Sequence, residues 1–518
     1  MKHIFTKLLI GSIILIMASC SDSDFTSKYP DPSKTSTSSP EKLMTGVFYS
    51  GKDYTFNSYW RIFTWDYSAM SKFTQTLGFL NTDGRYQNSD SYYEDRWENF
   101  YNVLTQYRVL ENVYNNLKEE DKPDYEVFVL LARIFVYDHL IQVADCWGDI
   151  PFSKAGYLAV TGDVAGSYPA YDTAETIYST VLSDLKAINT SLAAMTSPSA
   201  LTTSYLKAQD FINKGDLTLW RKYCNSLRLR VATRVADKGS LTTVARAAIN
   251  EMLSDPSTYP MVDNNAENIK VVPDADGFNY AQDYQNGWET WSGELNRASQ
   301  AMVDALKDDP RIDVIFDKNA DGNYVGVDPH TDYATQQALF DKGTYYCAYD
   351  TATFSRNKNL PGIIISAAEV SFLKANAYNS GYATGNAKDA FVKGMVLSTE
   401  FYYAINSTAT YRPPTPAPST ASVTAFAESK WDNATNKQEV ISTQIWLNFG
   451  FLQTTQSWAE IRRTGYPVLY FPIDNASSTV PNVPNRLRYP PSERNSNTKN
   501  YNAVKSKDNY TDKMFWAK

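Results

Sequence analysis

Histidine is scarce in this chain, which has three among 518 residues, and the patterns that commonly mark enzymes are missing. His139 and His330 stand far apart, so no paired spacing for zinc arises. The sequence also lacks the GxSxG, P-loop and GxGxxG motifs. A glycosidase built on two carboxylates leaves no reliable local motif, so it stays an alternative among 57 Asp and Glu residues. We therefore expect no enzyme.

Positive charge, long apolar runs and cysteine are also in short supply. A net charge of -8 and a pI near 5.2 argue against a nucleic-acid surface, which depends on clustered Lys and Arg. No apolar stretch after Cys20 has the length of a membrane-spanning helix. The remaining cysteines, Cys146, Cys224 and Cys347, are an odd set, so at least one stays free. Cys146 and Cys224 fall in helical patterns and are expected to be buried.

The N-terminus predicts export and lipidation. Two lysines precede an apolar run over residues 8–17, and two small residues follow before Cys20, which is the order of a signal peptide. A cysteine at that place resembles the lipobox of bacterial lipoproteins, although Met17 stands where Leu is commoner. We expect residues 1–19 to be removed as a signal peptide and Cys20 to carry the lipid. The alternative is a plain cleaved signal with Cys20 there by chance.

The residues after Cys20 predict a tether, and those beyond it one folded domain. Residues 20–40 are rich in Ser, Thr, Pro and Asp and bury too little apolar surface to fold. Asp22 and Asp24 look like the surface-export signals of Bacteroidetes lipoproteins, which indicates an outer-membrane anchor facing the exterior. No second linker of this kind follows, so residues 41–518 are expected to form a single domain. The Pro-rich stretch 413–419 is predicted to be an exposed loop.

Apolar residues recur mostly at steps of three and four, which predicts a mainly α fold. Stripes over 100–117 and 124–146 predict two helices that form a hairpin, because Pro123 and its acidic neighbours separate them. Strand signals are few, the best being 312–316 and 363–365. Tetratricopeptide-like helix pairs are expected, although no clean 34-residue period is present. Further helices are predicted over 173–188, 217–236, 242–253, 297–306, 366–378, 389–403 and 443–463.

One segment has the residue types of a calcium loop. Its acidic and amide residues fall at positions 1, 3, 5 and 12 of an EF-hand-like pattern, with Gly322 at position 6. The side chains concerned are Asp317, Asn319, Asp321 and Asp328. The last of these is shorter than the usual Glu, so Ca²⁺ binding here is the weaker hypothesis. We favour a turn at 319–322 of a β-hairpin between 312–316 and 324–327.

Four segments in order resemble the SusD/RagB family of Bacteroidetes nutrient-binding lipoproteins. Residues 146–152 read CWGDIPF, a helix end followed by a Gly-Asp-Ile-Pro turn in which Gly148 can stop the helix. Residues 219–230 read LWRKYCNSLRLR, and residues 458–467 read WAEIRRTGYP. The closing Arg, Tyr, Pro, Glu and Asn pattern falls within 488–495. From the residues themselves we expect Arg462 and Arg463 to satisfy carbonyls or carboxylates within the fold.

The resemblance implies a scaffold of tetratricopeptide-like helix pairs, a ligand site carried by loops, and no catalysis. It also implies a partner, a SusC-like TonB-dependent outer-membrane transporter. The function expected is therefore a cell-surface lipoprotein that binds a glycan or oligosaccharide and delivers it to the transporter. Two alternatives stay open: a peptide-binding relative, and a mainly structural transporter lid with little binding of its own.

Two tryptophans outside any clear helix are the first candidates for a ligand site. Trp288 and Trp291 lie between glycines, and exposed aromatic rings can stack on the apolar faces of sugars. The alternative is a pair of core side chains packed under a long loop. Tyr86 and Trp65 are secondary candidates, because the family builds its site partly from loops of the N-terminal half.

Overall fold

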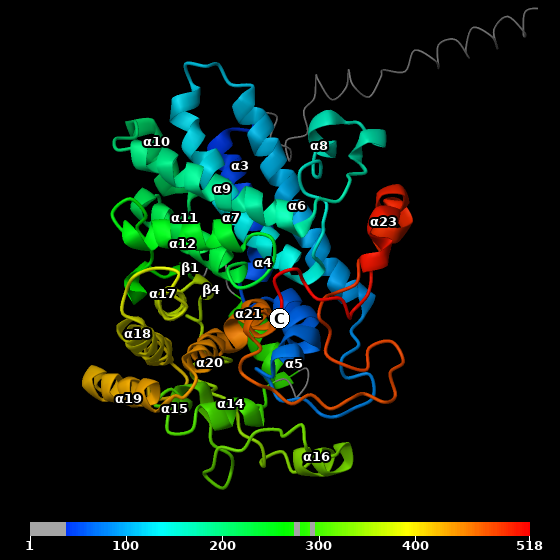
Figure 1. Cartoon of the computed structure of the whole chain (residues 1–518), viewed down its shortest axis with the longest axis vertical. Helices are drawn as coiled ribbons and strands as arrows, with labels where there is room; N and C mark the ends of the chain where they lie inside the picture. The colour runs from blue at the N-terminus through cyan, green and yellow to red at the C-terminus, as the bar shows by residue number, and fades with distance from the viewer. Residues whose placement is uncertain (1–37, 274–279, 291–295) are drawn as a thin grey trace, which may run out of the picture.

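The computed structural model describes residues 38–273, 280–290 and 296–518. Helices account for 57% and strands for 3%, so the expectation of a mainly α fold with minor strands is confirmed. The expected signal peptide, Cys20 and most of the tether lie outside the described residues. In Figure 1 most helices of residues 40–254 lie in the upper part, and α14 to α20 lie in the lower part.

The upper part is built on a hairpin of two long helices. α6 and α7 each have 26 residues and pack against each other, which confirms the predicted pair. The apolar stripe of α6 is buried at Phe100, Leu104 and Leu110, because α3 and α7 cover it. α9 packs on α7 and α11, and α12 packs on α11. The helices of this part are α3 (Pro40–Ser50), α6 (Asp90–Asn115), α7 (Lys122–Trp147), α9 (Ala174–Ala194), α10 (Ala200–Gln209), α11 (Leu217–Arg234) and α12 (Thr242–Ser254).

The expectation that no apolar stretch after Cys20 has membrane-spanning length is wrong: of the described helices, α7 alone is long and apolar enough to cross a membrane. In the fold, 89% of its most apolar window is buried, so it serves as a core helix. α7 ends at Gly148, which has φ +79°, and the Gly-Asp-Ile-Pro turn follows as expected. Asp149 then accepts a hydrogen bond from the backbone N–H of Ala174, at the start of α9. This family-like segment therefore joins two helices.

The lower part contains α14 (Gln300–Ala305), α16 (Tyr333–Phe340) and a second set of packed helices. These are α17 (Ala367–Asn379), α18 (Ala387–Ser407), α19 (Thr420–Asn433), α20 (Lys437–Phe449) and α21 (Thr454–Thr464). The prediction of one helix over 443–463 is wrong. Gly450, at φ +44° and ψ -137°, ends α20, and the short 3₁₀ segment η5 (Gly450–Gln453) precedes α21. Such backbone angles are open to glycine because it has no Cβ.

The strands form two small antiparallel pairs. β1 (Ile269–Val271) pairs with β4 (Gly362–Ile365), which confirms the strand predicted at 363–365. β2 (Phe316–Asp317) pairs with β3 (Ala348–Tyr349). The strand predicted over 312–316 is wrong, because Ile312–Ile315 forms the single turn α15. The carboxylate of Asp309 accepts hydrogen bonds from the backbone and guanidinium of Arg311 and thereby fixes the start of that turn.

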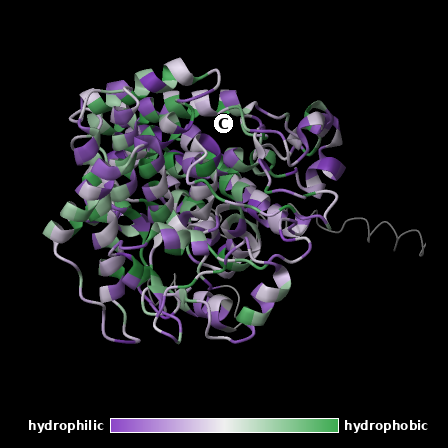
Figure 2. Ribbon diagram, turned by 60° about the horizontal axis from the view of Figure 1, so that its bottom comes forward, coloured by the Kyte–Doolittle hydropathy of each residue, from purple (hydrophilic) through white to green (hydrophobic). Residues whose placement is uncertain are grey.

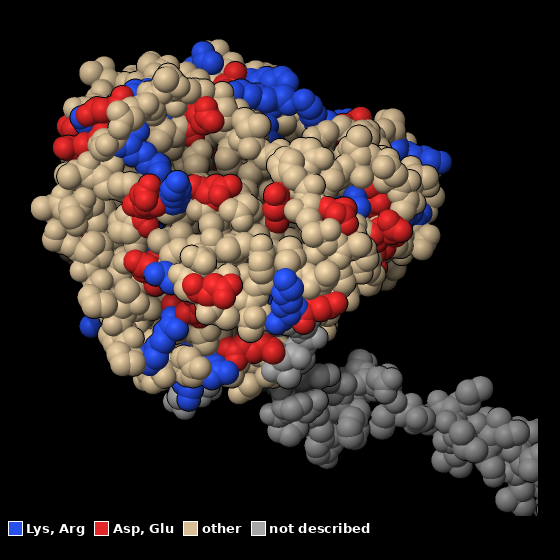
Figure 3. Space-filling view, turned by 90° about the horizontal axis from the view of Figure 1, so that it is seen from below, with Lys and Arg blue, Asp and Glu red and all other residues tan. Residues whose placement is uncertain are grey.

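Most of the helices are amphipathic, and one end of the molecule is hollowed (Figure 2, Figure 3). Most helices in Figure 2 carry both apolar and polar residues, as amphipathic helices packed on one side do. The end of the molecule that holds α14 and α16 is hollowed, with acidic and basic side chains interspersed over it (Figure 3).

Shorter elements connect the helices. The remaining elements are α4 (Lys52–Thr55), η1 (Trp60–Met70), α5 (Ser71–Thr74), α8 (Leu158–Thr161), η2 (Ala165–Ser167), η3 (Asn265–Glu267), α13 (Ala281–Gln285), η4 (Asn286–Thr290), α22 (Pro491–Ser496), α23 (Thr498–Val504) and η6 (Lys505–Lys507).

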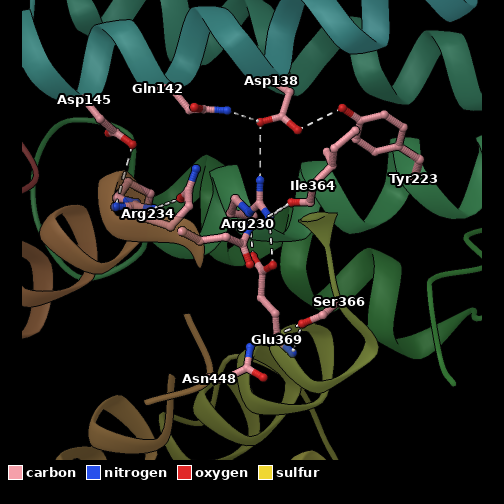
Figure 4. Close-up of polar contacts among 12 residues, drawn as sticks. Asp138, Gln142, Asp145, Tyr223, Arg230, Arg234, Ile364, Ser366, Glu369 and Asn448 are labelled. Atoms are coloured by element: carbon pink, nitrogen blue, oxygen red, sulfur yellow. Dashed lines mark hydrogen bonds and ion pairs between the residues drawn. The ribbon is translucent and has the colours of Figure 1, made fainter. Parts of the chain in front are cut away.

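A buried network of charges ties α7, α11 and α17 together (Figure 4). Arg230 on α11 donates to both carboxylate oxygens of Glu369, at 2.5 and 2.7 Å, and to Asp138 at 3.3 Å. It also donates to the backbone oxygen of Ile364 in β4. Asp138 accepts further hydrogen bonds from Tyr223 and Gln142. Arg230, one of the repeated arginines of α11, is thus structural.

The arginine pair of α21 has the structural role expected for it. Arg462 donates to the backbone oxygens of Trp458, Asp145 and Asn485. Arg463 forms ion pairs with the carboxylates of Glu460 and Asp237. The three cysteines after Cys20 are buried and free, which agrees with the expectation for Cys146 and Cys224.

Candidate ligand-binding site

The structure corrects the expectation for Trp288. Its side chain is 1% exposed, and its ring packs on Phe451 at 4.4 Å and on Tyr349 at 5.0 Å. The π-helical turn η4 directs this indole into a buried hydrophobic cluster that includes Tyr349, Phe354 and Phe451. The indole therefore cannot present a face to a ligand. Trp291 lies outside the described residues. The alternative of a tryptophan packed under a loop therefore holds for Trp288.

Tyr86 and Trp65 are also core residues. Tyr86 is 1% exposed, and its hydroxyl donates to the backbone oxygen of Pro472. Trp65 is 2% exposed, and its indole N–H donates to the hydroxyl of Thr455 at 2.9 Å. Neither side chain can stack on a ligand. Trp65 nevertheless belongs to η1, whose other face carries the aromatic side chains described below.

The calcium-loop pattern does not form one site: Asp317 and Asp328 contact different partners, and Asp321 is exposed. Asp317 accepts from Arg412 and Thr351, while Asp328 accepts from His330. Asn319 closes a turn, in which its backbone oxygen accepts from Gly322 at 3.0 Å. The predicted turn is thus present, but the predicted hairpin is wrong, because β2 pairs with β3. Among the described residues, no three His, Cys, Asp or Glu side chains gather as a metal site.

A row of aromatic rings that begins at Tyr59, directly before η1, and continues along η1 was not predicted from the sequence. Tyr59, Phe63 and Tyr67 follow one another at intervals of four residues, and we call these three side chains the aromatic row. Their ring centroids are 5.5 and 6.3 Å apart, and successive planes are tilted by 20° and 22°. All three are partly exposed, and the neighbouring Trp60 is 45% exposed. η1 is a π-helix, a rare conformation that is frequent at functional sites.

The opposite face of η1 is fixed in the core. Arg61 forms an ion pair with Asp66 at 3.2 Å and donates to the backbone oxygens of Thr55 and Leu452. Asp66 also accepts from the hydroxyl of Thr454. Burial raises the pKa of Asp66 to about 6, although Arg61 opposes this shift. Because these buried contacts lock the helix, the aromatic row is held in place before any ligand binds.

A groove continues from the end of the aromatic row. It has a volume of about 100 Å³, and Tyr67 forms part of its wall. Lys72 lies 5.4 Å from the centre of the Tyr67 ring, and Arg297 lies 5.6 Å from the centre of Phe340. Thr82 adds a polar residue to the wall. The site therefore combines aromatic faces with a few polar donors, which is the composition of a small-ligand site.

Comparison with known proteins agrees with this description. The model of the SusD-like family described as "Starch-binding associating with outer membrane" matches residues 32–490. No curated protein sequence matches the chain significantly. A solved chitin-binding protein has a TM-score of 0.73 and 23% identity, over 93% of this chain and 100% of that chain.

Two further solved structures share the fold. A chitin-binding SusD homolog from Flavobacterium johnsoniae has a TM-score of 0.71 and 18% identity, over 91% of this chain and 98% of its own. A SusD homolog from Bacteroides fragilis has a TM-score of 0.70 and 17% identity, over 92% and 99%. At these identities the structures establish the fold alone, whereas the family model covers most of the sequence. The chain belongs to the SusD-like family of outer-membrane nutrient-binding proteins, which are not enzymes.

Proposed function

We propose that this protein is a lipid-anchored receptor that captures an oligosaccharide on the aromatic row and delivers it to a SusC-like TonB-dependent transporter. The observation that carries the proposal is the set of nearly parallel rings on η1, beside the exposed Trp60. Sugar rings have apolar faces that pack on aromatic faces, and polar groups then fix their orientation. Two structural relatives are named as chitin-binding, so chitin oligosaccharides come first among the ligands to test.

The described strands favour a glycan over a peptide. A peptide that adds to a sheet needs an exposed strand edge several residues long. β1 to β4 have between two and four residues, so they offer few unpaired backbone groups. The aromatic row needs no backbone pairing from its ligand. A pure lid would not need ordered aromatic rings at its surface.

Calorimetry with a panel of neutral oligosaccharides tests the binding step. Trp60→Ala and Phe63→Ala are each expected to weaken binding about tenfold, because one stacked ring contributes on the order of 1 kcal/mol. Tyr333→Ala is the matched control, since Tyr333 on α16 is 45% exposed, as Trp60 is. Equal losses in all three variants, or binding of peptides alone, would contradict the proposal.

Purification from the native membrane tests the delivery step. We expect the full-length protein to copurify with a TonB-dependent barrel in mild detergent. Trp60→Ala should leave this association unchanged, because a binding-site ring is separate from the transporter contact in this proposal. If the protein binds oligosaccharide but never copurifies with a barrel, the receptor role is supported and the delivery role is contradicted.

A further inference from the structure

A second and larger cleft lies beside the groove. It has a volume of about 520 Å³, within the range of about 300–1,000 Å³ usual for small-ligand sites. Its walls come from α14, α20 and two loops. Backbone hydrogen bonds from Gly78 to Arg297 and from Gln300 to Val327 form a partition between cleft and groove. The two spaces are therefore separate sites.

The lining of this cleft is acidic. Asp304, Asp328 and Glu439 lie around it, and no lysine or arginine is among its lining residues. Within the described part of the chain, none of the three carboxylates forms an ion pair with Lys or Arg. Asp328 contacts His330 alone at ion-pair distance, 2.9 Å away. The negative charge of the cleft is thus left for a ligand to neutralise.

Gln75 provides a second and independent indication of a ligand. It is 2% exposed and lines the cleft, and its side-chain N–H donates to the backbone oxygen of Tyr470 at 2.6 Å. The side-chain oxygen of Gln75 accepts no hydrogen bond from the described residues. Its backbone is left-handed, with φ +49°, a strained conformation that concentrates at functional sites. The cleft is therefore rich in acceptors: the unpartnered amide oxygen of Gln75 and three carboxylates, of which Asp304 accepts from Gln300 and Asp328 from His330.

An aromatic ring completes the cleft. Tyr470 is 49% exposed and stacks on the imidazole of His330, with ring centroids 4.0 Å apart and planes tilted by 12°. One face of the phenol is therefore supported by His330. The exposed remainder of Tyr470 can pack on the apolar face of a sugar.

We infer that this cleft binds saccharides that bear free amino groups, such as oligomers of glucosamine. A protonated amine supplies the positive charge that no lysine or arginine of the lining provides, together with N–H donors for the carboxylates and the Gln75 oxygen, and the sugar ring packs on Tyr470. An N-acetyl group offers one N–H and no charge, so the acetylated oligomer fits this chemistry less well. Anionic glycans are repelled.

The experiment compares two trisaccharides that differ only in acetylation, tri-glucosamine and tri-N-acetylglucosamine, by calorimetry at pH 6. The wild-type protein should bind tri-glucosamine at least tenfold more tightly. The double variant Asp304→Asn/Glu439→Gln should lose that preference. Glu119→Gln/Glu120→Gln is the matched control, because it removes two charges at the α6–α7 turn, at the far end of the molecule in Figure 1.

The outcome is independent of the aromatic row. Trp60→Ala should leave tri-glucosamine binding unchanged, whereas Tyr470→Ala should weaken it about tenfold. Equal affinity for the two trisaccharides, no binding of tri-glucosamine, or equal losses in the cleft and control double variants would each overturn the inference. Loss of binding in Trp60→Ala alone would assign both sugars to Trp60 and the adjoining aromatic row.

Discussion

Replacing Arg230 by Met tests whether the buried charge network holds the helices together. The guanidinium makes two hydrogen bonds to Glu369, one to Asp138 and one to the Ile364 backbone oxygen. Met has a similar length and no charge, so the change leaves Glu369 unpaired in the core, where its side chain is 1% exposed. Removing one partner of a buried ion pair costs about 3–5 kcal/mol. Asp138 keeps its hydrogen bonds from Tyr223 and Gln142, so most of the loss arises at Glu369.

Urea unfolding followed by far-UV circular dichroism measures this loss as a lower transition midpoint at unchanged slope. The double variant Arg230→Met/Glu369→Leu should lose much less than the sum of its single changes, because no uncompensated charge stays buried. Lys118→Met is the control, since the Lys118–Glu120 pair is exposed and should leave the midpoint unchanged. A loss in Arg230→Met no larger than in this control, or additive losses in the double variant, would refute the reasoning.

Three further changes probe the backbone, the pH dependence and the anchor. Gly450→Ala should cost on the order of 1–3 kcal/mol in urea unfolding because φ is +44° there, whereas Gly46→Ala within α3 should cost nothing. Burial raises the pKa of Asp66 from 3.8 to about 6, so stability falls as the pH rises through that interval, and Asp66→Asn should flatten the fall. Cys20→Ala should move the protein from the membrane to the soluble fraction; continued membrane binding without the transporter would contradict a lipid anchor.

The helices that the sequence predicted are those with one apolar stripe. In α6 the stripe repeats every three to four residues, and α3 and α7 cover it as that spacing requires. α7 contains the same spacing, but from Val127 to Trp147 it is buried on nearly every side. The segment 443–463 shows where this reasoning stops. Apolar residues continue through Phe449, Phe451 and Leu452 into the next helix, so the period runs unbroken across the turn. The positive φ of Gly450 and the non-helical backbone of Gln453, which are properties of the folded chain, separate α20 from α21.

The prediction of ligand-site residues was wrong for a different reason. Trp288 looked exposed because no local stripe includes it, yet Tyr349, Phe354 and Phe451 bury it from segments at least 61 residues away. Burial by such distant partners leaves no local pattern. The aromatic row did leave one, since Tyr59, Phe63 and Tyr67 repeat every four residues. That repeat resembles the buried stripe of an ordinary helix, so its partial exposure required the structure.

The two proposed sites differ in the physical origin of their affinity, and ionic strength separates them. Stacking of a neutral sugar on the aromatic row involves no net charge, so salt should leave it nearly unchanged. Attraction between an ammonium group and the carboxylates of Asp304 and Glu439 acts across water, because both residues are exposed. Its range shrinks from about 10 Å at 0.1 M salt to about 3 Å at 1 M. A ligand that loses affinity over that interval is therefore bound in the acidic cleft, and one that keeps it is bound on the aromatic row.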